Sequence, residues 1–169
     1  MSADGASGDG AGEALKAERR ARVGMPGPAF AAYWLTNPEA IPPSSRLLGC
    51  RPLEADPERG FARSAFDIGM EFCNPTGAVQ GGFVAAMLDD TMAIGGLTKI
   101  GGGHFLPTLE MKLNYTRPSP PGELFAEGWL VHAGKSIAFL EGRLLNPDGE
   151  LCATSTATAL IRAFKRETG

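Results

Sequence analysis

One long apolar segment, residues 80–98, constrains the fold of this chain more than any other feature. Apolar side chains occur on most sides of the helix that this segment would form, which is typical of a buried helix. The positions that carry this pattern are Phe83, Ala86, Met87, Met92, Ala93 and Leu97. Glycines at 95–96 and 101–103 end the segment. The rest of the chain must therefore be arranged around one buried helix.

The N-terminal part of the chain predicts helices of a different kind. Residues 1–12 are small and polar and predict a disordered tail. Good helix formers follow over residues 13–23, and a second short helix is expected over residues 28–36. An Asn-Pro dipeptide at residues 37–38 and one pair of prolines at residues 42–43 then interrupt the chain. We expect an N-terminal helical extension over residues 13–43.

The remaining segments predict β-strands, two before the apolar helix and four after it. They alternate with turn sequences rich in Pro, Gly, Asp and Asn. The expected strands cover residues 46–54, 61–72, 108–116, 123–132, 136–146 and 151–164. An antiparallel sheet of about six strands has one face to bury, and only one central helix is available to cover it. Residues 44–165 therefore predict an α+β domain of the hotdog architecture, with the sheet wrapped around one long central helix.

Composition excludes several function classes. The 169 residues are 43% hydrophobic and 21% charged with a net charge of −3, so nothing favours a nucleic-acid partner. No apolar run approaches the roughly 20 residues that span a bilayer, and the N-terminus has no signal-like core. The cysteines Cys50, Cys73 and Cys152 match no metal pattern and predict buried thiols. We expect a cytoplasmic protein without a metal and without a membrane association.

The start of the apolar helix carries the main chemical signal. Gly81 and Gly82 leave backbone N–H groups bare at a helix N-terminus, where they can polarise a carbonyl oxygen. Asp89 lies further along the same apolar helix, where a carboxylate is costly unless it is paired or functional. Eight residues separate Gly81 from Asp89, about 12 Å along a helix axis. One carbonyl group cannot contact both, so the spacing predicts a dimer with sites shared between two antiparallel helices.

Several motifs then resemble one known family in order and spacing. Over residues 47–161 the chain is similar to hotdog-fold acyl-CoA thioesterases of the PaaI type, which include the 4-hydroxybenzoyl-CoA thioesterases of that branch. The motifs lie at residues 74–82, 108–118, 134–139 and 146–153, and Asp89 stands where the family places its catalytic acid. Gln80 replaces the family's usual histidine, whereas Gly81 keeps the backbone N–H.

This resemblance implies a set of site residues. Four have catalytic roles: Asp89 as base or nucleophile, Gly81 as oxyanion donor, Asn74 as a group that orients water or the leaving end, and Thr108 as a hydrogen-bond partner of Asp89 or its water. Six are expected to bind substrate, and they are Gln80, Gly82, Arg117, Gly134, Lys135 and Ser136. The resemblance also implies an acyl-CoA substrate with a small, medium-chain or aryl acyl group. It implies no cofactor beyond the coenzyme A of the substrate, and a homodimer that pairs into a homotetramer.

Simpler interpretations exist for several of these residues. Asn74 precedes a proline and is also typical of an ordinary turn, and Arg117 and Lys135 can be plain surface charges. Asp90, about 100° further round the helix, is expected to be a solvent or interface residue. His104 follows three glycines and predicts a solvated loop.

Two alternative functions compete with thioester hydrolysis. A hotdog dehydratase or hydratase needs a histidine paired with a carboxylate near the central helix, and neither His104 nor His132 lies there. A non-catalytic module that binds acyl-CoA as a sensor would be expected to lack the helix carboxylate and to carry a DNA-binding region. Asp89 is present and the acidic N-terminal tail carries no such region. Hydrolysis of an acyl-CoA therefore remains the leading hypothesis.

Overall fold

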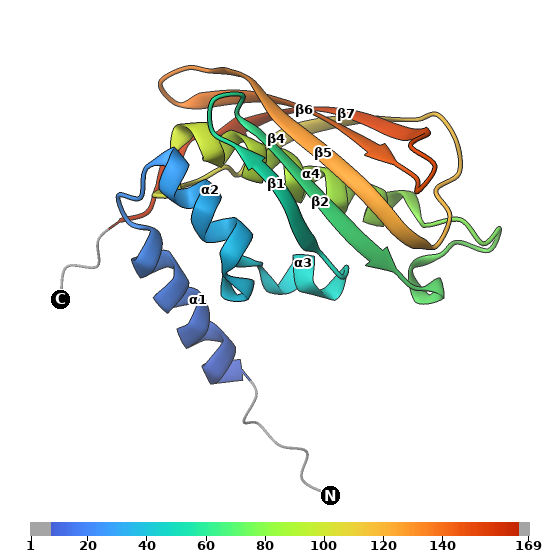
Figure 1. The fold of residues 1–169 in the computed structure, drawn as a ribbon, viewed down its shortest axis with the longest axis horizontal. Helices are drawn as coiled ribbons and strands as arrows, with labels where there is room; N and C mark the ends of the chain where they lie inside the picture. The colour runs from blue at the N-terminus through green and yellow to red at the C-terminus, as the bar shows by residue number, and fades with distance from the viewer. Residues whose placement is uncertain (1–7, 166–169) are drawn as a thin grey trace, which may run out of the picture.

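The computed structural model describes residues 8–165, and its centre is the long helix α4 (Gly81–Ile100). A six-stranded antiparallel sheet in the order β1-β2-β5-β6-β7-β4 curls around this helix. Figure 1 shows α4 running behind the strands that wrap it. The predicted hotdog fold is confirmed.

The strands follow the expected alternation of apolar segments and turns. Their bounds are β1 Arg51–Asp56, β2 Phe61–Ile68, β4 Thr108–Tyr115, β5 Gly122–Ala133, β6 Ile137–Leu145 and β7 Leu151–Leu160. A separate two-stranded sheet pairs β3 (His104–Phe105) with β8 (Arg162–Ala163). Alternate residues of β6 are buried, as expected for a sheet with one face against a core.

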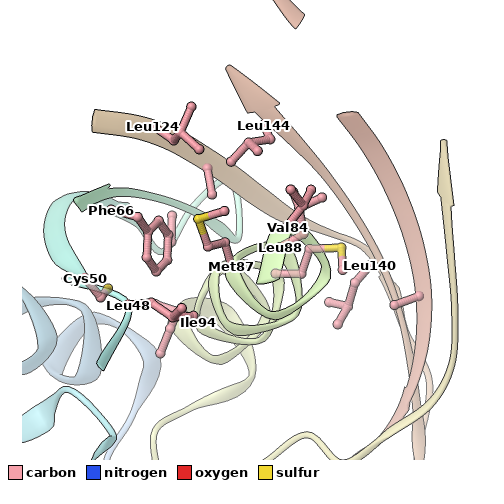
Figure 2. Close-up of a cluster of buried hydrophobic side chains, with 14 of the residues drawn as sticks. Leu48, Cys50, Phe66, Val84, Met87, Leu88, Ile94, Leu124, Leu140 and Leu144 are labelled. Carbon is pink, nitrogen blue, oxygen red and sulfur yellow. The ribbon is translucent and has the colours of Figure 1, made fainter. Parts of the chain in front are cut away.

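The core lies between α4 and the concave face of the sheet. Met87 and Leu88 of α4 are fully buried, and Figure 2 shows them among Phe66, Leu124 and Leu144 of the sheet. Most of the buried side chains of α4 are apolar, and their burial supplies the main stabilisation of the domain.

A glycine in β5 allows the helix to lie directly on the sheet. A Cβ atom added to Gly128 would lie 2.5 Å from the backbone nitrogen and Cα of Met92 in α4. Across the same contact, a side chain on Gly95 would collide with the carbonyl group of Gly128. Glycines on both surfaces thus remove the side chains that would hold helix and strand apart.

The N-terminal extension consists of α1 (Gly8–Arg22), α2 (Gly27–Thr36), the short 3₁₀ helix η1 (Pro38–Ala40) and α3 (Pro43–Leu47). Helix α2 packs against α4 and β1 and buries Phe30 and Trp34 in the core. Helix α1 instead projects away from the sheet (Figure 1).

Five expectations about the chain need correction. Helix α1 begins at Gly8, within the segment predicted as a disordered tail; residues 1–7 of that segment lie outside the described residues. Residues 46–50 were predicted as the start of a strand but belong to α3 and a turn at Gly49, since proline suits the first helical position and Gly49 has a φ of +65°.

Two more corrections concern the ends of strands. Strand β2 stops at Ile68, and the 3₁₀ helix η2 (Met70–Phe72) follows where a strand was expected. The last predicted strand is interrupted at Ile161, so that β8 pairs with β3 instead. His104 therefore lies half-buried in a strand and not in a solvated loop.

We predict that Gly128→Ala lowers the free energy of unfolding by about 1–3 kcal/mol, because its methyl group would push α4 off the sheet. Chemical denaturation measures this change. Gly134→Ala is the control, since its new Cβ would have an ordinary 3.7 Å contact with the carbonyl oxygen of Ile137. Equal stability of the two variants would contradict the close approach of α4 and β5.

Candidate active site

The N-terminus of α4 presents two free backbone donors. Gln80 is the N-cap residue, and its side chain makes no capping hydrogen bond. The N–H groups of Phe83 and Val84 donate to the carbonyl oxygen of Gln80, at 2.9 Å and 3.3 Å. Within residues 8–165, the N–H groups of Gly81 and Gly82 have no acceptor. The positive end of the helix dipole is therefore available to an external oxygen atom.

Tyr115 explains why a glycine stands at the first helical position. Its hydroxyl group donates to the carbonyl oxygen of Gly81 at 2.9 Å, and a Cβ atom on Gly81 would lie 2.9 Å from the hydroxyl oxygen. A Cβ atom on Gly82 would meet nothing within 4 Å. Tyr115 could not be assigned to the site from the sequence, because its contact depends on how β4 approaches the helix.

A groove of about 520 Å³ opens beside this helix terminus. Its walls include Asn74, Gly81, Tyr115 and Arg117, which come from two separate stretches of the sequence, residues 74–84 and 115–119. Three of these four residues were predicted as site residues, and the fold brings them together in one chain.

Asn74 holds the loop that forms one wall of the groove. Its Oδ1 atom accepts hydrogen bonds from the N–H group of Thr76 at 2.9 Å and from the Thr76 hydroxyl at 2.6 Å. Gly77 then completes the turn at a φ of +83°. The alternative interpretation of Asn74 as a turn residue is therefore correct, and its amide Nδ2 group still has no partner among the described residues.

Asp89 lies on α4 away from this groove, half-buried. The Thr108 hydroxyl donates to Asp89 Oδ1 at 2.6 Å within the same chain, which is the first of the two partners, Asp89 or its water, that the family resemblance implies for Thr108. This contact leaves Oδ2 available to another donor and fixes the orientation of the carboxylate.

The expected substrate-binding residues lie at two opposite ends of the domain. Arg117 forms an ion pair with Glu150 at 2.5 Å, at the start of β7. The turn at residues 134–136 lies beyond the other end of β7, where the Ile161 N–H group donates to the Ser136 carbonyl oxygen at 2.8 Å. Ten residues of β7 separate the two ends, roughly 30 Å of strand. One chain therefore does not bring Arg117 and Lys135 together.

Comparisons with known proteins match this architecture. The model of the thioesterase superfamily matches residues 76–153, from the loop before α4 to β7. A phenylacetic acid degradation-related, thioesterase-like protein of Ralstonia eutropha is 32% identical; the match covers 78% of this chain and 98% of that one, with a TM-score of 0.71. The chain belongs to the thioesterase superfamily, in its PaaI type.

More distant relatives are consistent with this membership. An esterase-like protein of Thermoplasma acidophilum is 31% identical to this chain over 85 residues. The match covers 49% of this chain and 62% of that protein. The Escherichia coli PaaI protein is 18% identical with a TM-score of 0.63, which supports the shared fold alone.

Gln80 occupies the position where the family usually has a histidine, and its side chain is exposed. Neither His104 nor His132 lies at the start of α4, so neither takes the place of that histidine. The ring of His104 lies 3.3 Å from the carbonyl oxygen of Gly101 at the far end of α4, and His132 stacks on Phe139 in the sheet. Within residues 8–165, no group of three or more His, Cys, Asp or Glu side chains could hold a metal ion, and no helix is long and apolar enough to cross a membrane.

Asp90, expected to be a solvent or interface residue, is half-buried within the chain itself. It faces the N-terminal extension, where Ser45 hydrogen-bonds to it. Burial raises the pKa of Asp90 to about 6; the Ser45 hydrogen bond opposes this shift, and the nearby Asp89 carboxylate adds to it. The difference arises because α3, which carries Ser45, stands where the sequence analysis expects the start of a strand.

We predict that the stability of the protein falls as pH rises from about 4 to about 6, through the titration of Asp90. The folded state holds its proton up to a pKa of about 6, whereas the unfolded state loses it near 3.8. Asp90→Asn removes the cost of the buried charge and should therefore be more stable than the native chain at pH 7. We expect a gain of about 1–2 kcal/mol, since partial solvent contact screens the native carboxylate and reduces that cost. Denaturation at pH 4 and pH 7 measures the difference; an equal decline in both proteins would contradict it.

Proposed function

We propose that this protein hydrolyses an acyl-CoA thioester to the free acid and coenzyme A. The observation that carries the proposal is the pair of unoccupied N–H donors at Gly81 and Gly82, in a fold that also holds a fixed carboxylate at Asp89. A thioester carbonyl needs such donors where negative charge develops on its oxygen atom. The membership of the thioesterase superfamily supports the same chemistry. The acyl group is small, medium-chain or aryl.

The oxyanion is stabilised at the start of α4. The Gly81 N–H group and the helix dipole polarise the carbonyl group in a way that needs no side chain, and so the exchange of histidine for Gln80 leaves this function intact. The free amide group of Asn74, in the same groove, orients the attacking water or the leaving end of the substrate.

The two halves of the site come from two chains. Gly81 and Asp89 lie about 12 Å apart along one helix axis, too far to contact the same carbonyl group. Strand β4 forms a free edge of the sheet, and its side chains Leu109 and Tyr115 are 57% and 56% exposed. An exposed apolar edge of this kind favours pairing with a second copy. In a two-fold dimer, Gly81 of one chain would face Asp89 of its partner, and two such dimers would form a tetramer.

Asp89 drives the hydrolytic step in one of two ways. As a base, it takes a proton from water while the water oxygen bonds to the carbonyl carbon; the tetrahedral intermediate then expels the coenzyme A thiolate, which receives that proton. As a nucleophile, the carboxylate bonds to the carbonyl carbon and expels the thiolate, and water then cleaves the mixed anhydride. In both routes the Thr108 hydrogen bond holds the carboxylate in place.

We predict that Asp89→Asn lowers kcat by at least about 10²-fold while the fold remains intact, because the amide can act neither as base nor as nucleophile. Release of free thiol from a panel of acyl-CoA substrates measures the rate, and circular dichroism checks the fold. Asp67→Asn, at an exposed carboxylate of β2, is the matched control and should keep its activity. Near-normal turnover by Asp89→Asn would exclude the assignment.

A second prediction concerns the backbone donor. Gly81→Pro removes the N–H group at a helix position that tolerates proline, and should lower kcat by about 10²–10³-fold. Gly81→Ala is its control, since it brings the same Cβ toward Tyr115 but keeps the N–H group. If both variants are equally inactive, steric contact with Tyr115 is the cause, and not the loss of the donor.

The shared site has a test of its own. A 1:1 mixture of Gly81→Pro and Asp89→Asn chains, refolded together, should recover about one quarter of the native activity, because half of the dimers are mixed and each mixed dimer has one intact site. Activity no greater than that of the separate variants would show that each chain holds a complete site.

A further inference from the structure

A second and larger groove, of about 1240 Å³, lies between α1 and the C-terminal segment. Side chains of α1 form one wall, and β3, β8 and the residues after β8 form the other. The lining residues are Lys16, Glu18, Arg19, Arg20, Val23, Phe105, Arg162, Ala163, Phe164 and Lys165. None of them belongs to the groove beside Gly81.

The groove is strongly basic in a protein that is acidic overall. Five of the 16 Lys and Arg residues line it, although the chain has a net charge of −3. Its one carboxylate, Glu18, is paired with Arg22 at 3.0 Å. Arg19, Arg162 and Lys165 are exposed and have no acidic partner among the described residues. A concave surface with this excess of positive charge attracts a ligand with several negative charges.

Two stacked phenyl rings lie beside these charges. The rings of Phe105 and Phe164 have centroids 5.2 Å apart and lie within 18° of parallel. The Arg22 guanidinium group lies 5.1 Å from the centre of the Phe164 ring. Phe105 remains 41% exposed. A fixed aromatic ring with a free surface can stack against a planar base.

Hydrogen bonds to residues 102–104, just after α4, hold both walls of the groove in place. Arg22 is 8% exposed and donates from Nε to the Gly102 carbonyl oxygen at 2.9 Å and from Nη2 to the His104 carbonyl oxygen at 3.1 Å. The N–H group of Phe164 donates to Gly103 O at 2.9 Å. Both walls are therefore fixed to the same short stretch after α4. Figure 1 shows the C-terminal end of the described chain passing the C-terminal end of α1.

This basic groove lies close to the catalytic carboxylate of its own chain. Phe105 precedes Thr108 by three residues, so the two Cα atoms are no more than about 11 Å apart. Thr108 is the hydrogen-bond partner of Asp89. On the other side, Arg162 follows Ile161, whose N–H group donates to the Ser136 carbonyl oxygen. The groove thus adjoins both the stretch that leads to Thr108 and the strand end that contacts the turn at residues 134–136.

We propose that this groove binds the nucleotide end of coenzyme A, with the adenine on Phe105 and the phosphate groups on Arg19, Arg162 and Lys165. The proposal rests on the proposed hydrolysis of acyl-CoA and makes α1 a substrate-binding element of the chain that supplies Asp89. Guanidinium groups suit phosphates, because they donate two parallel hydrogen bonds. The groove accordingly selects thioesters of coenzyme A over those of pantetheine alone.

The test compares two thioesters with the same acyl group, one of coenzyme A and one of pantetheine. In Arg19→Gln/Arg162→Gln, the ratio of kcat/KM for acyl-CoA to kcat/KM for acyl-pantetheine should fall about tenfold or more through a higher KM for acyl-CoA. Arg51→Gln/Arg59→Gln is the matched control: it also removes two exposed arginines, which are engaged in surface ion pairs outside the groove. The control should keep the native ratio.

Binding of adenosine 3′,5′-bisphosphate, measured by calorimetry, separates this proposal from the proposed function. Tight binding that weakens about tenfold in Arg19→Gln/Arg162→Gln and falls with added salt supports the groove even if no thioester is cleaved. An unchanged ratio and unchanged binding in that variant overturn the groove while hydrolysis by Asp89 stands. The same variant could instead lose activity only toward a thioester of an acidic acyl-carrier protein and keep it toward acyl-CoA. That result would also overturn the proposal and assign the groove to the carrier protein.

Discussion

The packing of α4 against the concave face of one sheet determines the rest of this structure. The helix approaches β5 closely because Gly128 and Gly95 place no side chains between the two backbones. That approach sets how far the sheet must curl, and so brings β4 across the start of α4, where Tyr115 contacts Gly81. The same packing leaves one side of the helix terminus open. The free N–H groups of Gly81 and Gly82 and the carboxylate of Asp89 are therefore placed by a single helix position within the sheet.

Much of the fold could be predicted from local sequence. The apolar residues of α4, the strand segments and the turns between them each have a short-range signature, and their positions agree with the structure to within a few residues. The exceptions have physical causes. The strand expected at residue 46 fails because Pro43 starts α3, and β3 escapes notice because two residues such as His104 and Phe105 carry no pattern without their partner β8. Strand order itself depends on contacts between distant segments.

The candidate site likewise contains residues that could be predicted from the sequence and residues that could not. Gly81 and Asp89 stand out in sequence because glycines at a helix start and a carboxylate in an apolar helix are both costly, and the resemblance to a family added Thr108. Tyr115 and the groove of Arg19 and Arg162 could not be found, since each depends on two segments that the sequence separates widely. Their side chains are ordinary for a strand or a surface helix. Only the fold gives them neighbours.

Helix α1 meets the domain through Arg22, a side chain inserted between two carbonyl groups. A helix anchored to the domain chiefly at its C-terminal end can change length, charge or direction during evolution with little effect on the core. Under the proposed function, the residues that hydrolyse the thioester and the helix that distinguishes carriers of the acyl group are then open to separate selection. One ancestral domain could in this way acquire new substrates by exchanging its N-terminal arm, while the geometry at Gly81 and Asp89 stayed the same.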